Sequence, residues 1–187
     1  MTTDGPGPRT IRIRRPTASP NEGPAAPTFQ VAQPLVGLKV GIRTDSAWRS
    51  WRTIASIWQE LLVAGGAIVS TVETHAMVGD SGAGDRKQIE ELAAVVDCAI
   101  VGLGTCGSCT SFTIADSVTF EDRERPVVAV VTEEFETHGR NMATFLGHGD
   151  LRVLVLPYPL EARPDAELQR IAEEHFPTAL AMLGVSS

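Results

Sequence analysis

The chain has 187 residues, of which 43% are hydrophobic and 21% are charged, as in an ordinary soluble globular protein. This length fits one domain built around a single hydrophobic core. No apolar run approaches the roughly 20 residues of a membrane-spanning helix, which argues against membrane insertion. The 23 acidic and 16 basic side chains give a net charge of −7, which argues against general nucleic-acid binding through a basic surface.

The first 36 residues differ in composition from the rest, because they contain seven of the twelve prolines and few large apolar side chains. Such a segment cannot offset the entropy of ordering, so a disordered Pro/Arg-rich arm is expected over residues 1–36. Its surplus of arginine leaves binding of an acidic partner as an alternative to a solvated linker. No apolar segment of signal-peptide length follows Arg14-Arg15, so a cytoplasmic location is expected.

From residue 37 to residue 187, short apolar runs alternate with segments of helical period, which predicts a single α/β domain. The Gly-rich stretch 79–85 is interpreted as a loop. Strands are expected over residues 38–43, 67–72, 98–102, 127–131 and 153–156. Helices are expected from Ser46 to Leu62 and over residues 86–96, 111–122, 134–146 and 165–183, the last broken or bent near Pro177. This pattern predicts a three-layer sandwich with a mainly parallel, Rossmann-like sheet of about five strands.

Polar and aromatic side chains surround the start of the first expected helix. Thr44, Asp45 and Ser46 carry oxygens that can cap this helix, and substrate contact by Asp45 and Ser46 is the alternative. Trp48 and Trp51 are spaced three residues apart, so they are expected either in the core or on one exposed helix face. The second arrangement suggests a subunit interface.

The turn after the third strand is the densest cluster of reactive groups, and ligands of such sheets usually approach the carboxyl ends of the strands. Gly102, Gly104 and Gly107 have the spacing of a dinucleotide-binding loop, but that loop normally follows the first strand, so no dinucleotide is expected. Backbone N–H groups at this turn still favour an anion. Substrate contacts are therefore expected from Gly104, Thr105, Gly107, Ser108, Thr110 and Ser111.

Cys106 and Cys109 form a CxxC pair at the expected start of a helix, where the helix dipole lowers the pKa of a thiol. Cys106 is the better candidate for a nucleophile. Residues three apart can approach closely enough for a disulfide, so Cys109 can resolve a bond made at Cys106. Two small packing thiols are the alternative interpretation.

No metal and no cofactor are expected. A structural zinc site needs four ligands, whereas the sequence has one CxxC pair and a Cys98 that lies inside a strand. Completion of a site by His75 or His138 is the less favoured alternative. Electrons for a redox reaction would come from an external thiol or a protein reductant.

Further polar residues are expected at the same edge of the sheet. Thr132 and Glu134 follow the fourth strand, where they either position a substrate or begin a helix. His75 follows the second strand, where it is either a general acid or base or a solvated loop residue.

The stretch from residue 97 to residue 159 resembles the UGSC family, which is named for a selenocysteine-Gly-Ser-Cys signature and includes members with cysteine in place of selenocysteine. The resemblance implies that Cys106 occupies the selenocysteine position as a soft nucleophile, with Cys109 nearby to resolve its adduct. The matching segments are residues 99–104, 106–111, 121, 126–128, 132–135 and 146–147.

A more distant likeness is to the selenocysteine region of glycine reductase component B and of D-proline reductase, which implies reductive cleavage of a substrate bond. Three positions depart from the UGSC pattern, because Thr105 replaces an Asp, and Ala115 and Tyr158 each replace a His. The missing histidines imply that a proton comes from Tyr158, Asp116, Glu134, another subunit or water.

The sequence therefore predicts a cysteine-dependent redox or reductive-cleavage enzyme that acts on a small molecule, without nucleic-acid or membrane partners. Two alternatives remain: a redox-neutral lyase or transferase with a cysteine nucleophile, and a noncatalytic subunit of a heteromeric enzyme. A homo- or hetero-oligomer is expected in each case.

Overall fold

The structure is a computed structural model, and it describes residues 28–75 and 79–185. Five parallel strands form one sheet in the order β2-β1-β3-β4-β5, which confirms the predicted α/β class. The strands are β1 (Lys39–Asp45), β2 (Ile68–Thr74), β3 (Cys98–Gly104), β4 (Val127–Thr132) and β5 (Arg152–Leu156).

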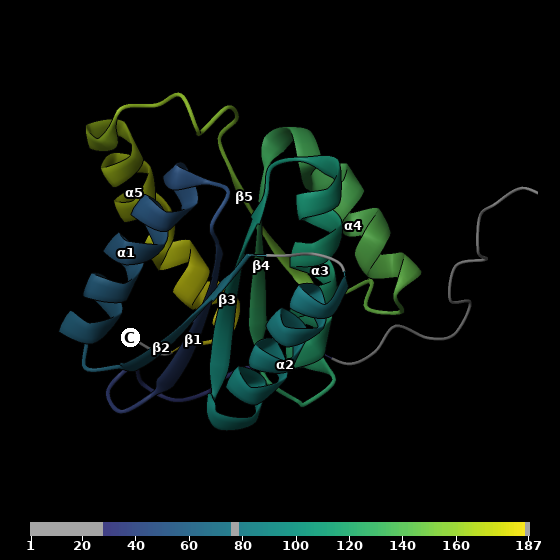
Figure 1. Ribbon diagram of the computed structural model, residues 1–187. Coiled ribbons are helices and arrows are strands. Elements are labelled where there is room, and N and C mark those ends of the chain that lie inside the picture. Colours follow the sequence, from purple (N-terminus) through teal and green to yellow (C-terminus); the bar gives the residue numbers. More distant parts are fainter. Residues whose placement is uncertain (1–27, 76–78, 186–187) are drawn as a thin grey trace, which may run out of the picture.

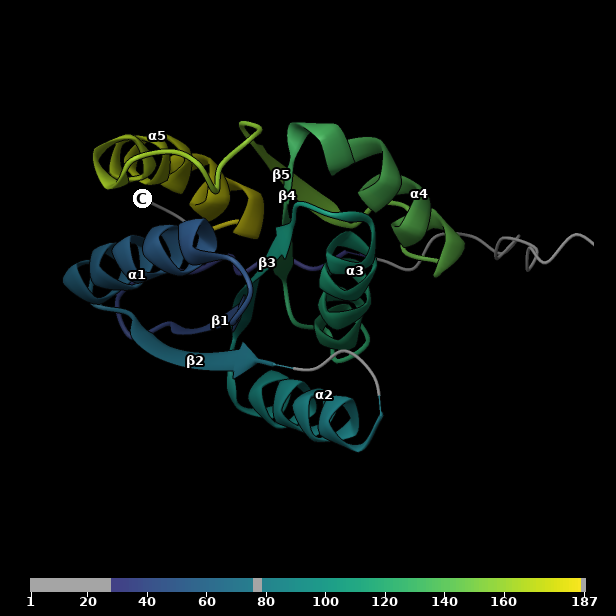
Figure 2. The same cartoon turned by 45° about the horizontal axis from the view of Figure 1, so that its top comes forward.

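Helices cover both faces of this sheet, so the molecule has the three layers that the sequence predicts (Figure 1). Seen along the sheet in Figure 2, α1 and α5 lie on one side, and α2, α3 and α4 lie on the other. The helices are α1 (Arg49–Ala64), α2 (Gly79–Val95), α3 (Gly107–Glu121), α4 (Glu136–Phe145) and α5 (Asp165–Leu183), with a short 3-10 turn η1 (Glu133–Phe135) before α4.

Each face of the sheet has its own hydrophobic core. Side chains from one face pack with α1 and α5, and those from the other face pack with α2, α3 and α4. The middle strand β3 is buried at all seven positions because helices cover it on both sides. This arrangement accounts for its almost uninterrupted apolar sequence.

The strand order determines where a ligand would approach. Because all five strands are parallel, their carboxyl ends lie at one edge of the sheet, at the top of Figure 1. The connections from β1 and β3 leave toward opposite faces, so the order of the strands reverses between these two neighbours. Ligands of open α/β sheets bind beside such a switch point. The loops after Asp45 and Gly104 therefore form the favoured position for a site.

The prediction of a loop over residues 79–85 is wrong, because α2 already begins at Gly79. Glycine has a low helix propensity, but this first part of the helix is held by tertiary contacts. Gly82 and Asp85 are buried, and the Asp85 carboxylate accepts the backbone N–H of His75 at 2.7 Å.

Of the predicted break or bend near Pro177, the break is absent, because α5 continues from Asp165 to Leu183. Pro177 is exposed, while the neighbouring Phe176 packs on Trp58 and Ala179 is fully buried. These contacts hold the helix together across the missing backbone N–H.

Of the two positions expected for Trp51, the core is confirmed and the exposed helix face is wrong. Its side chain is fully buried, its ring packs edge-on against Trp58, and its indole N–H donates to the Arg43 carbonyl at 3.2 Å. An open face formed by Trp48 and Trp51 is therefore excluded, since only Trp48 is partly exposed.

Residues 1–27 of the predicted arm lie outside the described residues. The remaining part, residues 28–36, contacts the body of the molecule: Val31 N–H donates to the Leu183 carbonyl at 2.9 Å, and Leu35 packs against the hydrophobic core.

Among the helices in the described ranges, none is both long enough and apolar enough to cross a membrane.

Candidate functional site

The two cysteines of the CxxC pair lie directly beyond the carboxyl end of β3. Cys106 is the N-cap of α3, and Cys109 is in its first turn, so the two Cα atoms are only 5.1 Å apart. Their sulfurs are joined as a disulfide. The backbone N–H of Cys109 points at Cys106 Sγ, at 3.1 Å, where the partial positive charge of the helix N-terminus also acts. This geometry stabilises an anionic sulfur at Cys106.

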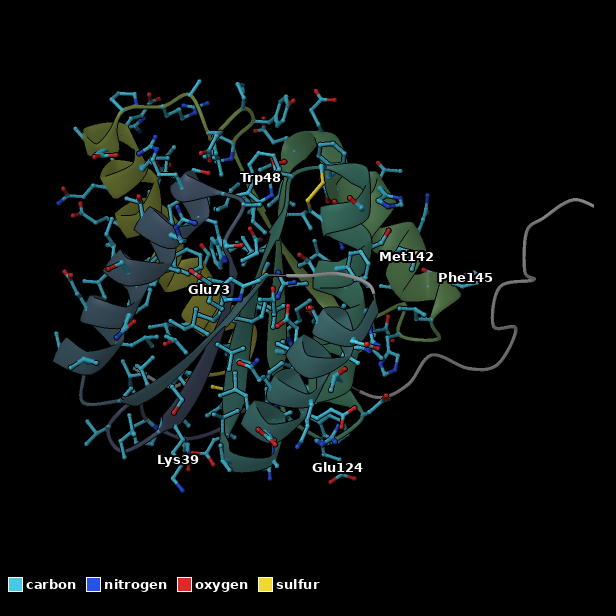
Figure 3. The ribbon with its side chains drawn as sticks, viewed as in Figure 1. Lys39, Trp48, Glu73, Glu124, Met142 and Phe145 are labelled. Atoms are coloured by element: carbon cyan, nitrogen blue, oxygen red, sulfur yellow. A yellow bond between two sulfur atoms is a disulfide. The ribbon has the colours of Figure 1, made fainter. Side chains whose placement is uncertain are left out.

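The two sulfur-bearing residues differ in accessibility. Cys106 is half-buried, whereas Cys109 is only 8% exposed. The Ser108 hydroxyl lies 3.5 Å from Cys106 Sγ, and the Trp48 indole N–H donates to Cys109 Sγ at 3.4 Å. Figure 3 shows Trp48 beside the yellow disulfide bond. An external reactant therefore reaches Cys106 more readily than Cys109.

Threonine side chains support the turn that carries Cys106. The buried Thr110 hydroxyl donates to the Cys106 carbonyl at 2.7 Å, and the buried Thr132 hydroxyl donates to Thr105 Oγ1 at 3.2 Å. Thr132 thus links the end of β4 to the turn after β3. Thr110 and Thr132 hold the backbone in this structure, while Gly107 and Ser108 are exposed on the outside of the turn.

Gly104 permits the close approach of α3 to the end of β3. A Cβ atom at this position would lie 2.9 Å from the Thr110 hydroxyl oxygen and 2.9 Å from a Val131 methyl group. Gly102 and Gly104 are both part of β3, whereas the glycines of a dinucleotide loop follow a strand. These glycines therefore serve packing in this structure.

His138, which the sequence analysis considers only as a less favoured metal ligand, lies at this site as a hydrogen-bonding residue. It extends from α4 so that its Nε2 lies 3.1 Å from the Gly107 carbonyl and 3.1 Å from the Ser111 hydroxyl. A carbonyl oxygen only accepts, so the bond to Gly107 requires a proton on Nε2. The imidazole N–H of His138 therefore binds the residue that directly follows Cys106. No local pattern in the sequence identifies this contact, because it depends on the packing of α4 beside α3.

Other predicted site residues are exposed or have their contacts elsewhere. Glu134 is exposed, Tyr158 packs its ring against Phe135, and His75 pairs with Glu73 at 3.1 Å. Ser46 is exposed at the edge of the sheet. Among the described residues, no hydrogen bond or ion pair joins any of these side chains to either sulfur.

A buried charge cluster lies beneath the turn, between β1 and α3. The Arg43 guanidinium donates to the Gly102 carbonyl at 2.7 Å and pairs with Asp116 at 2.9 Å and Asp45 at 3.6 Å. The other oxygen of Asp45 accepts the backbone N–H groups of Ala47 and Trp48, at 3.0 and 3.1 Å. Asp45 is thus a buried structural group that orders the loop after β1, rather than an exposed contact for a substrate.

Helix α1 itself is capped from a distant part of the chain. The side chain of Glu161, in the loop before α5, accepts the backbone N–H groups of Arg49 and Ser50 at 3.2 and 3.0 Å. The predicted capping by Thr44, Asp45 and Ser46 is therefore wrong for the helix proper, because Asp45 binds the two residues that precede it.

A cavity of about 280 Å³ lies between α2 and α3, with Arg43 and Asp116 among its lining residues. Burial raises the pKa of Asp116, and the adjacent Arg43 guanidinium opposes part of that rise. Asp116 is ten residues beyond Cys106 on the same helix, which is about 15 Å along the axis. Ala115, where the family resemblance implies a His, lines the same cavity, but neither Cys106 nor Cys109 does.

The clustering of metal-binding side chains bears on the alternative of a metal site. Over residues 28–75 and 79–185, no three His, Cys, Asp or Glu side chains are grouped in a way that would hold a metal ion. Cys98 is free and fully buried in β3, consistent with its expected structural role.

A search of curated proteins found no match to this chain. The likeness to glycine reductase component B and D-proline reductase stays a prediction. A family model described as "UGSC family" matches residues 12–185, which include β1 to α5 and the disulfide turn. Since this match spans most of the sequence, the chain belongs to the UGSC family.

Proposed function

We propose that the chain is a thiol-dependent redox enzyme that reduces a small molecule through Cys106 and Cys109. One observation carries the proposal: two sulfurs at bonding distance share a helix N-terminus, with the first accessible and the second shielded. A nucleophilic thiol needs a stabilised thiolate and access to substrate, and a resolving thiol needs proximity and protection from other thiols.

The proposed reaction starts from the reduced dithiol and a small substrate R–S–S–R′. The Cys106 thiolate attacks one substrate sulfur, which forms a mixed disulfide and breaks the S–S bond to release R′S⁻. The Cys109 thiolate then attacks Cys106 Sγ and releases RS⁻, so the protein is oxidised to the disulfide and the substrate gains two electrons. The two protons of the original thiols end on the two products. An external dithiol or protein reductant restores the dithiol.

The surroundings of the sulfurs support this division of roles. The backbone N–H of Cys109 and the N-terminus of α3 favour the anion at Cys106, and His138 lies beside the same turn as a group that can exchange protons. Cys109 is shielded, so an incoming reductant attacks the disulfide at Cys106.

Loss of the nucleophile gives the first test. Cys106→Ser is expected to lower the turnover rate of a small disulfide substrate by about 100-fold or more, because a hydroxyl is not ionised at neutral pH. Cys98→Ala, which removes the third cysteine from the core, serves as the control and is expected to retain turnover. Retained turnover in Cys106→Ser would refute the proposal.

Loss of the resolving thiol gives the second test. Cys109→Ser is expected to stop after the first step, so intact mass should show one substrate fragment attached per chain, and peptide mapping should place it on Cys106. Addition of a reductant should release the fragment. Full turnover by Cys109→Ser without added thiol would contradict the redox cycle and identify a redox-neutral cysteine nucleophile instead.

A further inference from the structure

We infer that Trp48 is a catalytic residue whose indole N–H stabilises the thiolate of Cys109. The inference rests on the proposed redox function of the pair and extends it to a side chain at the start of α1. It starts from one contact, because Trp48 Nε1 lies 3.4 Å from Cys109 Sγ and donates to it (Figure 3). Each sulfur of the disulfide has its own N–H donor. The backbone N–H of Cys109 donates to Cys106 Sγ, and the Trp48 indole donates to Cys109 Sγ.

The backbone of Trp48 is anchored by the buried charge cluster of Arg43, Asp45 and Asp116. Trp48 directly precedes α1, and its backbone N–H donates to Asp45 Oδ1 at 3.1 Å. Asp45 is only 2% exposed, and its second oxygen faces the Leu103 N–H at 3.4 Å and the Arg43 guanidinium at 3.6 Å. The Asp45 carboxylate therefore joins the start of α1 to the ends of β1 and β3, and the Arg43 guanidinium holds this carboxylate in place.

Helix α3, which carries Cys109, is anchored to the same cluster. Cys109 and Asp116 are seven residues apart on α3, so they lie on the same side of the helix, two turns from one another. Asp116 pairs with Arg43 at 2.9 Å, which ties this side of α3 to β1. Donor and acceptor therefore belong to two helices that are both anchored to the buried end of β1.

The oxidation state of the sulfur determines how much this bond contributes. A neutral sulfur in a disulfide is a weak acceptor, whereas a thiolate carries a full negative charge and accepts strongly. When a reductant attacks Cys106, Cys109 is the leaving group and takes the electron pair of the broken S–S bond. The indole N–H thus points at the atom where the charge develops. In the forward direction the same bond favours the ionised form that attacks Cys106.

The test measures ionisation of Cys109 alone, in the full chain and without turnover. Cys106→Ser leaves one thiol in the turn and keeps a residue that is a good helix N-cap. Ionisation is followed by the ultraviolet absorbance of the thiolate across a pH series. Cys98 does not interfere, because burial raises its pKa to about 12. Addition of Trp48→Phe is expected to lower the acid dissociation constant of Cys109 about tenfold, since a charge-assisted hydrogen bond is lost.

A matched control separates the lost donor from the change of ring. Trp58→Phe, in the same Cys106→Ser background, removes an indole N–H that binds the Ala172 carbonyl at 2.7 Å. It is expected to leave the acid dissociation constant of Cys109 unchanged within about twofold. Both variants leave every charged and titratable side chain other than the substituted cysteine unchanged, Arg43, Asp45, Asp116 and His138 among them.

A second measurement keeps all the tryptophans, so it can be made even where Trp48→Phe does not fold. In Cys106→Ser, the Trp48 indole N–H resonance is expected to shift with the ionisation of Cys109, and this shift should vanish when Cys109→Ser is added. An indole resonance that does not respond, or an unchanged dissociation constant in Trp48→Phe, would overturn the inference. Neither result depends on substrate reduction, so failure here is distinct from failure of the proposed function.

Discussion

Three cysteines of one chain occupy three different environments, and this difference controls their reactivity. Cys106 is half-buried at a helix N-terminus, Cys109 is shielded, and Cys98 is fully buried in β3. Burial, with a smaller contribution from the negative charge of Asp97, raises the pKa of Cys98 to about 12. The Cys98 thiol therefore stays protonated and unreactive over the physiological pH range.

This difference predicts the result of alkylation. After reduction of the folded protein at pH 8, Cys106 is expected to react first and Cys98 not at all, whereas all three thiols should react in denaturant. Intact mass followed by peptide mapping distinguishes these states. Alkylation of Cys98 in the folded chain, at a rate similar to that in denaturant, would show that β3 is accessible.

At the residue scale, the sequence was sufficient to predict the cysteine pair, because CxxC, small residues and a strand-to-helix turn coincide at one place. It was not sufficient to predict that Trp48 and His138 contact this turn. Both come from elements distant in sequence, and their relevance depends on how α1 and α4 pack beside α3. Spacing along the chain carries no information about such contacts.

At the scale of the elements, β3 packs tightly against α1, and Gly102 makes this approach possible. A Cβ atom at Gly102 would lie 2.6 Å from the Trp51 ring, which is fully buried on α1. Gly102→Ala is expected to lower the free energy of unfolding by about 1–3 kcal/mol, because the ring or the strand must shift. Gly84→Ala, on the exposed side of α2 with nothing within 4 Å, is the control.

Denaturant unfolding of the two variants checks this expectation. Gly84→Ala should be neutral or slightly stabilising, since alanine favours a helix more than glycine does. Equal stability of Gly102→Ala and wild type would mean that Trp51 and β3 are not as tightly packed as described.

Element types were predictable from hydrophobic periodicity, whereas several element ends were not. Helix α1 is capped by Glu161, which lies 112 residues from Arg49 in the sequence. Helix α2 includes a Gly-rich stretch because Asp85 binds the backbone of His75. In both places a tertiary contact outweighs the local preference of the residues, so local rules place the boundary incorrectly.

For the whole molecule, the pH dependence of stability is expected to reflect a carboxyl group at the far end of α3. Glu121 is 3% exposed, and burial raises its pKa to about 7, with Arg152 opposing the rise and Asp122 adding to it. The folded state thus binds a proton more tightly than the unfolded state does. Between about pH 4.5 and 7 this group makes the protein less stable as the pH rises.

Glu121→Gln is expected to remove this component. The difference in unfolding free energy between variant and wild type should change by up to about 3 kcal/mol from pH 4.5 to pH 8, in favour of the variant at the higher pH. Urea unfolding across this pH range measures it, with Glu124→Gln at an exposed position as the control. A difference that does not vary with pH would show that Glu121 ionises normally in the folded protein.

The α/β class was predictable because five strand-like runs alternate with helices. The order of the strands was not, since it depends on which face each connection crosses and not on any single run. This order decides the site: it makes β1 and β3 neighbours, so that Asp45, Trp48 and the cysteine pair meet at one edge.

Arg43 also has a consequence for how this protein can change during evolution. One side chain contacts the Gly102 carbonyl of β3, the carboxylate at the end of its own strand, and Asp116 of α3. A lysine has a single ammonium group and cannot reproduce this forked set of contacts. Loss of Arg43 leaves the carboxylates of Asp45 and Asp116 without their cation. Positions 43 and 116 should therefore vary together among relatives.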